Sequence, residues 1–337
     1  MVKMGVIGAG RMAMVHIRGI VSGVSNVKIQ AVADPYMSDA TKEELNQLGI
    51  MHTYTDHRTI LEDAEIQAVL IAASTDTLAA LSVEALDAGK HTFCEKPVGR
   101  SIESLMPVVE AVKRHPELKY QVGFNRRFDH NFRALYDTVK KGMLGRLHFL
   151  RICSRDSVTP PQSYVRVSGG IFLDMMIHDI DLIRYFAQSD VEEVYAIGNV
   201  LIDQYFADEG DVDTAIVTMK FKNGAMGVID NSRKAVYGYD QRAEIHGSLG
   251  CAELNNDIKN SVLVSTAEGV RNDGPVWDTL DRYVAAYRAE MRSFADAIEN
   301  DLETCTSIQD SLQAVMVGLA CNKSLSEKRP VKLSEIL

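Results

Sequence analysis

The stretch Gly8-Ala9-Gly10-Arg11-Met12-Ala13 follows a short apolar run, residues 4–7, and leads into a segment with the spacing of a helix. In a G-x-G-x-x-A element, Gly8 permits a tight turn, Gly10 lets the backbone approach a pyrophosphate, and the small Ala13 allows close helix packing. The helix N-terminus then faces the negative charge. A purely structural glycine turn is the alternative, but the strand before the loop and the helix after it are the context that a dinucleotide site requires. The stretch therefore predicts a dinucleotide-binding unit.

Asp34 stands at the end of the second expected strand, 21 residues after Ala13. An acid at this place accepts hydrogen bonds from both ribose hydroxyls and repels the 2′-phosphate of NADP, so the sequence favours NAD. Pro35 adds no positive charge, although Arg11 could partly neutralise a phosphate, and Asp34 could also simply end a strand. We expect the cofactor to contact Gly8, Ala9, Gly10, Arg11, Met12, Asp34, Pro35, Ser74, Thr75, Glu95 and Lys96.

Up to about residue 123, short apolar runs alternate with longer segments of helical period. This alternation is typical of βαβ units and predicts a parallel sheet. The expected strands are residues 4–7, 27–33, 52–54, 68–72, 91–94 and 120–123, with helices such as 38–48 and 77–88 between them.

After residue 145, strand-like runs follow one another with little helix between them, which predicts an antiparallel sheet. The expected strands are residues 147–154, 191–200, 214–221, 225–230 and 242–247, and the Asn223-Gly224 step predicts a hairpin. One helix is expected over 170–186. Two more, 280–299 and 307–325, could cover a sheet face or pack back on the first domain.

The chain has 337 residues, more than one hydrophobic core usually supports, so we expect two domains. They are a cofactor domain, 1–123, and a domain for substrate binding and oligomerisation, 124–337. The net charge of −10 argues against nucleic acid or an anionic membrane as partner, and no apolar run reaches the ~20 residues that would cross a bilayer. The five scattered cysteines lack a Cys-x-x-Cys pair, and the N-terminus is a poor signal peptide, so we expect a cytoplasmic protein.

Glu95, Lys96 and Pro97 follow the fifth expected strand, at the edge where an open parallel sheet usually places its ligand. A lysine there can contact a substrate hydroxyl and stabilise a developing alkoxide. A lysine before proline is more often a solvated loop residue. Lys96 becomes a candidate for substrate contact only because the sequence also contains the phosphate-binding loop.

The expected helix over 170–186 is mostly apolar, yet Asp174, His178 and Asp181 occur at i, i+4 and i+7 and would share one face. A carboxylate one turn from an imidazole can fix its tautomer and raise its basicity, which suits an oriented general base. A structural hydrogen-bonded pair at a domain interface is the alternative. Asp179 and Arg184 are expected to be solvated or salt-bridged.

A metal site could also use His and Asp at this spacing, but the other histidines have no matching ligands nearby, and we predict no metal. Hydride transfer from an alcohol needs only a base and an orienting shell. The sequence also lacks a G-x-S-x-G elbow and a Walker lysine loop.

These motifs together resemble the glucose-fructose oxidoreductase, inositol dehydrogenase and MocA-like family over essentially the whole chain. The similarity lies in the G-x-G loop, Asp34, the Glu95-Lys96-Pro97 turn, Gly123-Phe124-Asn125-Arg126-Arg127-Phe128 and Gly169-Gly170 leading to Asp174-x-x-x-His178. Within the family, the run 235–242 is most similar to bacterial inositol 2-dehydrogenases.

The resemblance implies a Rossmann α/β domain followed by an α+β domain with an open, mostly antiparallel sheet, and an oligomer, often a tetramer. It implies that Lys96, Asp174 and His178 are catalytic, with His178 taking the hydroxyl proton as the nicotinamide accepts hydride. The expected substrate contacts are Lys96, Arg127, Asp156, Asp174, His178 and Tyr237, with Tyr164 as a further candidate.

On this basis we expect NAD-dependent oxidation of a secondary hydroxyl on a cyclic polyol, myo-inositol to its 2-keto form. A polyhydroxylated ring suits a pocket rich in groups that donate and accept hydrogen bonds. The alternatives are scyllo-inositol or another sugar as substrate, a redox-neutral enzyme that keeps its NAD, and a catalytically silent NAD-binding sensor.

Overall fold

The structure is a computed structural model that describes residues 1–336. The chain forms two compact units, each described separately below. The first comprises Met1–Asp129 and Val284–Val315, and the second comprises His130–Tyr283 and the segment from Met316 onward.

The first unit is built on a six-stranded parallel sheet with the strand order β3-β2-β1-β4-β5-β6. Its strands are β1 (Val2–Ile7), β2 (Val27–Ala33), β3 (Thr53–Tyr54), β4 (Ala68–Ile71), β5 (His91–Glu95) and β6 (Tyr120–Gly123). This is the order of the doubly wound dinucleotide-binding fold, in which ligands bind beyond the carboxyl ends of the strands. The predicted parallel sheet is confirmed, and each expected strand lies within two residues of an observed one.

Helices connect these strands, and some begin at side-chain caps. They are α1 (Arg11–Gly23), α2 (Asp39–Gln47), α3 (Arg58–Glu62), α4 (Thr75–Asp87) and α5 (Ile102–Arg114), with the short η1 (Asn125–Phe128) after β6. The Ser38 hydroxyl accepts the Thr41 N–H at the start of α2, and Ser101 and Ser104 form a capping box at the start of α5. Much of α11 (Thr279–Glu299) also belongs to this unit.

The core of the first unit lies between the sheet and the helices α1 and α11. Ile17 of α1 is fully buried together with Met4 and Val6 of β1. Phe294 of α11 packs edge-on against Phe93 of β5, with ring centroids 5.9 Å apart. This packing fixes α1, and hence the loop before it, on the sheet.

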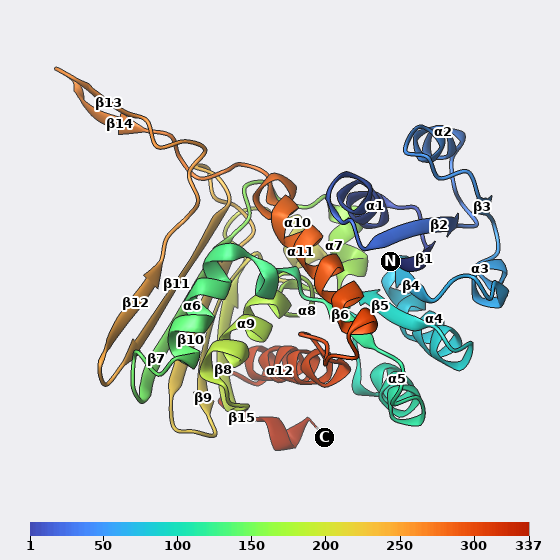
Figure 1. Ribbon diagram of the computed structural model, residues 1–337. Coiled ribbons are helices and arrows are strands. Elements are labelled where there is room, and N and C mark those ends of the chain that lie inside the picture. The colour runs from blue at the N-terminus through green and yellow to red at the C-terminus, as the bar shows by residue number, and fades with distance from the viewer. Residues whose placement is uncertain (337) are drawn as a thin grey trace. The chain divides into compact units, whose positions relative to one another are not determined.

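The second unit contains a seven-stranded sheet with the order β12-β11-β7-β10-β9-β8-β15 (Figure 1). Its strands are β7 (Leu147–Arg155), β8 (Val191–Asn199), β9 (Thr214–Phe221), β10 (Met226–Ser232), β11 (Asp240–Gly247), β12 (Gly250–Leu254) and β15 (Val331–Lys332). Only the β7–β10 pair is parallel among these neighbours, so the expectation of a mostly antiparallel sheet is confirmed. Gly224, at φ +87°, occupies the expected hairpin turn between β9 and β10.

Helices α6 (His130–Lys140) and α9 (Ile177–Ala187) lie beside this sheet, where α9 contacts β7 and β10 and α6 contacts β12 (Figure 1). The other helical segments are α7 (Gln162–Ser168), α8 (Ile171–Asp174), α10 (Tyr205–Asp208), most of α12 (Ile308–Glu327) and η2 (Leu333–Glu335).

The expectation of one continuous helix over 170–186 is wrong. The segment is divided into α8 and α9 at residues 175 and 176. There the Met176 N–H donates to the Ile171 carbonyl five residues back, at 2.8 Å, which widens the turn. Asp174 therefore ends one helix, and His178 lies in the first turn of the next, rather than on one uninterrupted face.

A two-stranded hairpin, β13 (Leu263–Thr266) and β14 (Gly269–Asn272), was not expected from the sequence. In Figure 1 it extends beyond the seven-stranded sheet. Its apolar residues Leu263, Val264 and Val270 are exposed, so it is held by its own strand pairing rather than by a core. Across residues 1–336, the helices are all too short or too polar to cross a membrane.

Candidate cofactor and catalytic residues

The loop after β1 has the geometry of a phosphate-binding turn. Gly8 adopts φ +105°, and a Cβ at this position would lie 2.4 Å from the Ala72 carbonyl oxygen, so only glycine fits. Gly10 is the N-cap of α1, and within the described chain no atom outside its immediate neighbours lies within 4 Å of its Cβ position. The N-terminus of α1 therefore has space for an anion beside its backbone N–H groups, as a pyrophosphate requires.

Asp34, just beyond β2, is fixed by two backbone hydrogen bonds. Its Oδ2 accepts the Ala9 N–H at 2.7 Å, and its Oδ1 accepts the Tyr36 N–H at 2.7 Å. The first bond ties the carboxylate to the glycine-rich loop. Each oxygen keeps a further lone pair, so the carboxylate can still accept hydrogen bonds from a ribose diol.

Other predicted cofactor residues lie at the same edge of the sheet. Ser74 is the N-cap of α4 and Thr75 is its first residue, directly after β4. Strand β4 pairs with β1, with Ile71 opposite Ile7, so both residues follow the strand beside the glycine-rich loop. The donors expected to hold a dinucleotide are therefore grouped within the first unit.

The Glu95-Lys96-Pro97 turn begins at the end of β5, again at the carboxyl edge, and its Lys96-Pro97 peptide bond is cis. The buried Glu95 carboxylate accepts the Lys96 N–H through Oε2 at 3.1 Å. Through Oε1 it binds His16 Nε2 at 2.6 Å. Lys96 itself is half-buried, as suits a cationic group that must reach a ligand.

In the second unit, Asp174 is the centre of a polar cluster. The Tyr164 hydroxyl donates to its Oδ1 at 2.8 Å, and Arg233 Nη1 donates to its Oδ2 at 3.0 Å. Arg233 also lies 3.7 Å from an Asp156 oxygen. The structure thus brings Tyr164 to Asp174, and Asp174 and Asp156 to one arginine, while the half-buried His178 lies in the first turn of the following helix.

Arg233 was missed by the sequence analysis. It is 3% exposed, and burial alone would lower its pKa, but the Asp174 and Asp156 carboxylates outweigh burial and raise the pKa above its usual value. Arg233 lies directly after β10 and 59 residues from Asp174, and no local motif marks it. A buried carboxylate needs a charged partner, and Arg233 provides one for Asp174.

One acid on α9 has surroundings that the sequence pattern did not indicate. Asp179 is fully buried and accepts a hydrogen bond from Asn231 Nδ2 at 2.9 Å, so it is not solvated. Arg184 forms the expected salt bridge, with Asp190 at 3.1 Å. Asp181 is also buried.

Tyr237 and Arg127 lie in different environments. The exposed Tyr237 donates its hydroxyl to Asp240 Oδ2 at 2.6 Å and accepts from Arg155 at 2.9 Å. Burial of part of the phenol raises the pKa of Tyr237, and the Asp240 carboxylate raises it further. Arg127, in the first unit, is buried and bound to Asp310 at 2.9 Å.

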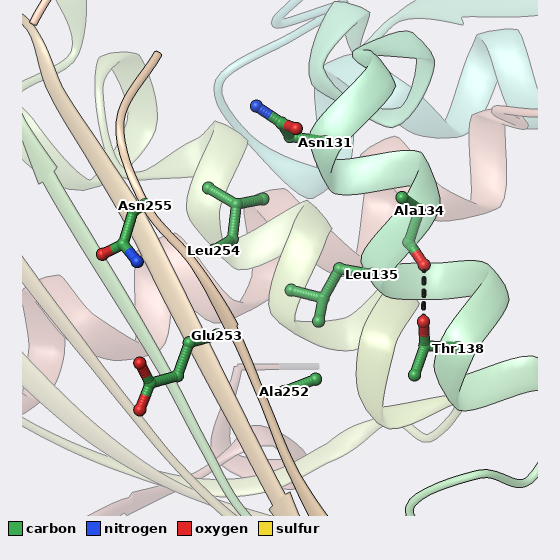
Figure 2. A pocket seen from close by; sticks show the side chains of 8 residues that line it. All are labelled: Asn131, Ala134, Leu135, Thr138, Ala252, Glu253, Leu254 and Asn255. Carbon is green, nitrogen blue, oxygen red and sulfur yellow. Dashed lines mark hydrogen bonds between the residues drawn. The ribbon is translucent and has the colours of Figure 1, made fainter. Parts of the chain in front are cut away.

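A groove of about 250 Å³ lies between α6 and β12 of the second unit (Figure 2). It is lined by Asn131, Ala134, Leu135, Thr138, Ala252, Glu253, Leu254 and Asn255. The described residues that line this groove include none of the predicted cofactor or catalytic residues, so the groove is separate from the candidate cofactor and catalytic sites.

Comparison with known proteins gives full-length similarity. Residues 2–124 match the family described as "Oxidoreductase family, NAD-binding Rossmann fold", and residues 132–253 match the "GFO/IDH/MocA C-terminal domain". The chain is 41% identical to the myo-inositol 2-dehydrogenase of Thermotoga maritima over 99% of both chains. It is 37% identical to the inositol 2-dehydrogenase of Rhizobium meliloti, again over 99% of both.

A solved structure of scyllo-inositol dehydrogenase from Lactobacillus casei, with bound NAD(H) and scyllo-inositol, is also similar. Its TM-score is 0.91 at 29% identity, with 99% of each chain covered.

Proposed function

Because the chain belongs to the GFO/IDH/MocA family of NAD-dependent oxidoreductases, which act on CH–OH groups, we propose that it is an inositol 2-dehydrogenase. The substrate would be myo-inositol and the product its 2-keto form. The observation that carries the proposal is the 41% identity to a myo-inositol 2-dehydrogenase over 99% of both chains.

The first unit supplies the groups that would hold NAD. The N-terminus of α1 would bind the pyrophosphate, with Gly8 and Gly10 giving the backbone its close approach. The Asp34 carboxylate, fixed by the Ala9 N–H, would accept the two hydroxyls of the ribose. When bound, NAD supplies a nicotinamide ring that accepts a hydride from the carbon being oxidised.

Lys96 and His178 are assigned to the reacting hydroxyl. The Lys96 ammonium would donate a hydrogen bond to the substrate oxygen and stabilise negative charge as it develops there. His178 would take the hydroxyl proton. Asp174 would orient His178 and stabilise the imidazolium that forms, and Tyr164 and Arg233 hold the Asp174 carboxylate in place.

The remaining substrate contacts would come from polar side chains that can bind ring hydroxyls. Asp156 is half-buried and offers acceptor oxygens, and Tyr237 is exposed and offers a hydroxyl that both donates and accepts. A polyol requires both kinds of group. Arg127 is bound to Asp310, and we assign its substrate role only through the Gly123–Phe128 motif.

scyllo-Inositol is the second candidate substrate, because the structurally similar Lactobacillus casei enzyme has scyllo-inositol bound. The two isomers differ at one carbon, so the shape of the substrate pocket decides between them.

The test is formation of NADH or NADPH, followed by absorbance, with NAD or NADP and each of myo-inositol, scyllo-inositol, chiro-inositol, glucose and xylose. NADH formed fastest with myo-inositol is the expected result. Lys96→Ala should abolish the signal, while Lys42→Ala, at an exposed lysine of the same unit, should not. Absence of NADH with every polyol, in a protein that still binds NAD, would contradict the proposal.

A further inference from the structure

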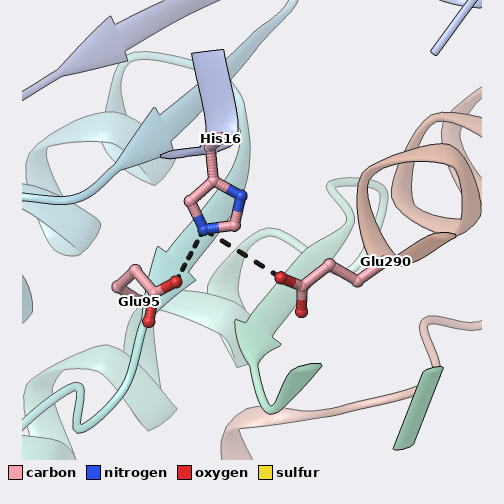
Figure 3. Close-up of side chains that lie close together, drawn as sticks. All are labelled: His16, Glu95 and Glu290. Atoms are coloured by element: carbon pink, nitrogen blue, oxygen red, sulfur yellow. Dashed lines mark hydrogen bonds and ion pairs between the residues drawn. The ribbon is translucent and has the colours of Figure 1, made fainter. Parts of the chain in front are cut away.

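Three ionisable side chains meet in the interior of the first unit (Figure 3). They are His16 on α1, Glu95 at the end of β5 and Glu290 on α11, and all three are buried. His16 Nε2 lies 2.6 Å from Glu95 Oε1 and 4.0 Å from Glu290 Oε1. One atom from each residue lies within 4.8 Å of the others.

Glu290 is the anomalous member of this cluster. Its side chain is fully buried, and within residues 1–336 neither of its carboxyl oxygens receives a hydrogen bond. Burial raises the pKa of Glu290 well above its usual value, and the charge of Glu95 raises it further. Two carboxyl groups so close in a dry interior do not both ionise, and burial without a hydrogen bond disfavours the charged form of Glu290.

Glu95, by contrast, is held at both oxygens. Oε1 binds His16, and Oε2 accepts the backbone N–H of Lys96 at 3.1 Å. A Cβ at position 123 would lie 3.1 Å from this carboxyl group. The absence of a side chain at Gly123 therefore leaves space for the Glu95 carboxylate. The carboxylate therefore connects α1, the helix that begins at the glycine-rich loop, with the backbone of Lys96.

Two aromatic rings lie beside His16. Its ring lies edge-on to Phe93 at 5.4 Å and to Tyr287 at 5.3 Å. On the far side of the cluster, Gln121 Nε2 donates to the Glu290 backbone carbonyl at 3.2 Å. The Tyr287 phenol is therefore a further titratable group beside the cluster.

The same three residue types can bind zinc, but the distances favour a hydrogen bond. Two ligands on one tetrahedral zinc, each about 2.0–2.2 Å from the metal, stand on the order of 3.3 Å apart. The His16–Glu95 separation of 2.6 Å is shorter than that and lies close to the roughly 2.7–2.9 Å of a charge-assisted N–H···O hydrogen bond.

We propose that Glu95 is a positioning residue that sets the backbone of Lys96 through its bond to His16, and that Glu290 is its neutral, proton-bearing neighbour. A neutral Glu290 leaves Glu95 as the single carboxylate that attracts the imidazole N–H. The position of Lys96 is thereby tied to α1 and hence to the cofactor loop. The consequence for turnover rests on the proposed function, in which Lys96 contacts the substrate.

The protonation of Glu290 can be tested without any enzyme assay. Infrared difference spectra of wild type against Glu290→Gln at neutral pH should show the C=O band of a protonated carboxyl group in the wild type only. Glu110→Gln, at an exposed glutamate paired with Lys113, is the matched control and should leave the band in place. Absence of the band from the wild type, or a stoichiometric metal ion found by elemental analysis, would overturn the proposal even if the Gln variant failed to fold.

The positioning role is tested at His16. His16→Phe keeps a ring against Phe93 but loses the donor, whereas His16→Gln keeps an N–H donor. We expect His16→Phe to lower kcat for myo-inositol about tenfold, with KM and the Kd of NAD changed less than about twofold, and His16→Gln to recover most of kcat. His57→Phe, which removes an exposed His–Glu pair of similar length, is the control and should have no effect.

A second readout does not depend on turnover. The NMR signal of ¹³C-methylated Lys96, assigned with Lys96→Arg, should shift in His16→Phe and stay in place in His16→Gln. An unmoved signal with unchanged kcat, or equal changes in both His16 variants, would contradict the positioning role. If the wild type oxidises no inositol but the Lys96 signal responds as expected, the proposed function fails and the positioning inference stands.

Discussion

Arg233 Nη1 lies 3.0 Å from Asp174 Oδ2, and both side chains are buried in the second unit. The pair holds together the cluster that contains Tyr164 and Asp156. A buried ion pair of this kind adds little stability by itself, but removal of one partner leaves an uncompensated charge. Arg233 therefore determines whether Asp174 can remain an ordered carboxylate.

Replacement of this arginine should destabilise the second unit. We expect Arg233→Met to lower the free energy of unfolding by about 3–5 kcal/mol, because Asp174 and Asp156 would lose their shared cation. Urea denaturation followed by circular dichroism measures the change. Arg166→Met, at an exposed arginine bonded to Glu209, should leave unfolding unchanged, and equal effects of the two substitutions would refute the explanation.

The two loop glycines should respond differently to alanine. Gly8→Ala forces a side chain into φ +105° and against the Ala72 carbonyl, so it should lower the melting temperature and abolish NAD binding. Gly10 has φ −74° and open space at its Cβ position, so the Gly10→Ala protein should fold normally. It should bind NAD about tenfold more weakly, because the new Cβ would occupy the place of the pyrophosphate. Calorimetry of unfolding and of NAD binding gives both quantities. A Gly10→Ala protein with unchanged NAD affinity would argue against the proposed phosphate position.

Asp34 should control the choice of cofactor. Asp34→Ser removes the carboxylate that would bind the ribose diol and that would repel a 2′-phosphate, so NAD affinity should fall by about tenfold or more while NADP affinity rises. Titration calorimetry with each nucleotide tests this, with the exposed Asp39→Ser as control. An unchanged preference for NAD over NADP in the Asp34 variant would show that the carboxylate only binds the Ala9 and Tyr36 N–H groups.

The Arg127–Asp310 pair should make stability depend on pH. Burial alone would raise the pKa of Asp310, but Arg127 and the hydrogen bonds from Ser307 together outweigh burial and hold the pKa below its usual value. Such a group stabilises the fold above the pKa of an unfolded aspartate, about 3.9, and this contribution is lost as pH falls through the lower folded value. Asp310→Asn should therefore lower stability by about 1 kcal/mol at neutral pH, and the difference should shrink below about pH 4. A difference that stays constant down to low pH would exclude this ion pair as its source.

Local sequence patterns predicted much of the fold. The six parallel strands and the Asn223-Gly224 hairpin depend on short-range periodicity and turn chemistry, and both are confirmed. The break between α8 and α9 was missed because residues 175 and 176 are both methionine, which continues a helical pattern without a glycine or proline to interrupt it.

The surroundings of the candidate site were less accessible to sequence reasoning. Asp174 and its helix could be found from polar residues in an apolar segment, but tertiary packing brings Arg233 to Asp174 from the segment directly after β10. Burial of Asp179 against Asn231 has the same origin. The catalytic assignments of Lys96, Asp174 and His178 stay predictions until the variants are measured.

The strand order of the second unit has a consequence for how the protein is made. Strand β15 pairs Val331 with Val194 of β8, and β7 lies between β10 and β11, which are encoded some seventy or more residues later. Pairings between such distant segments pay a large loop-closure entropy before any ladder bond forms, and they slow folding. On the ribosome, the parallel sheet of the first unit can pair its strands early, whereas the second sheet must wait until nearly the last of its residues has emerged.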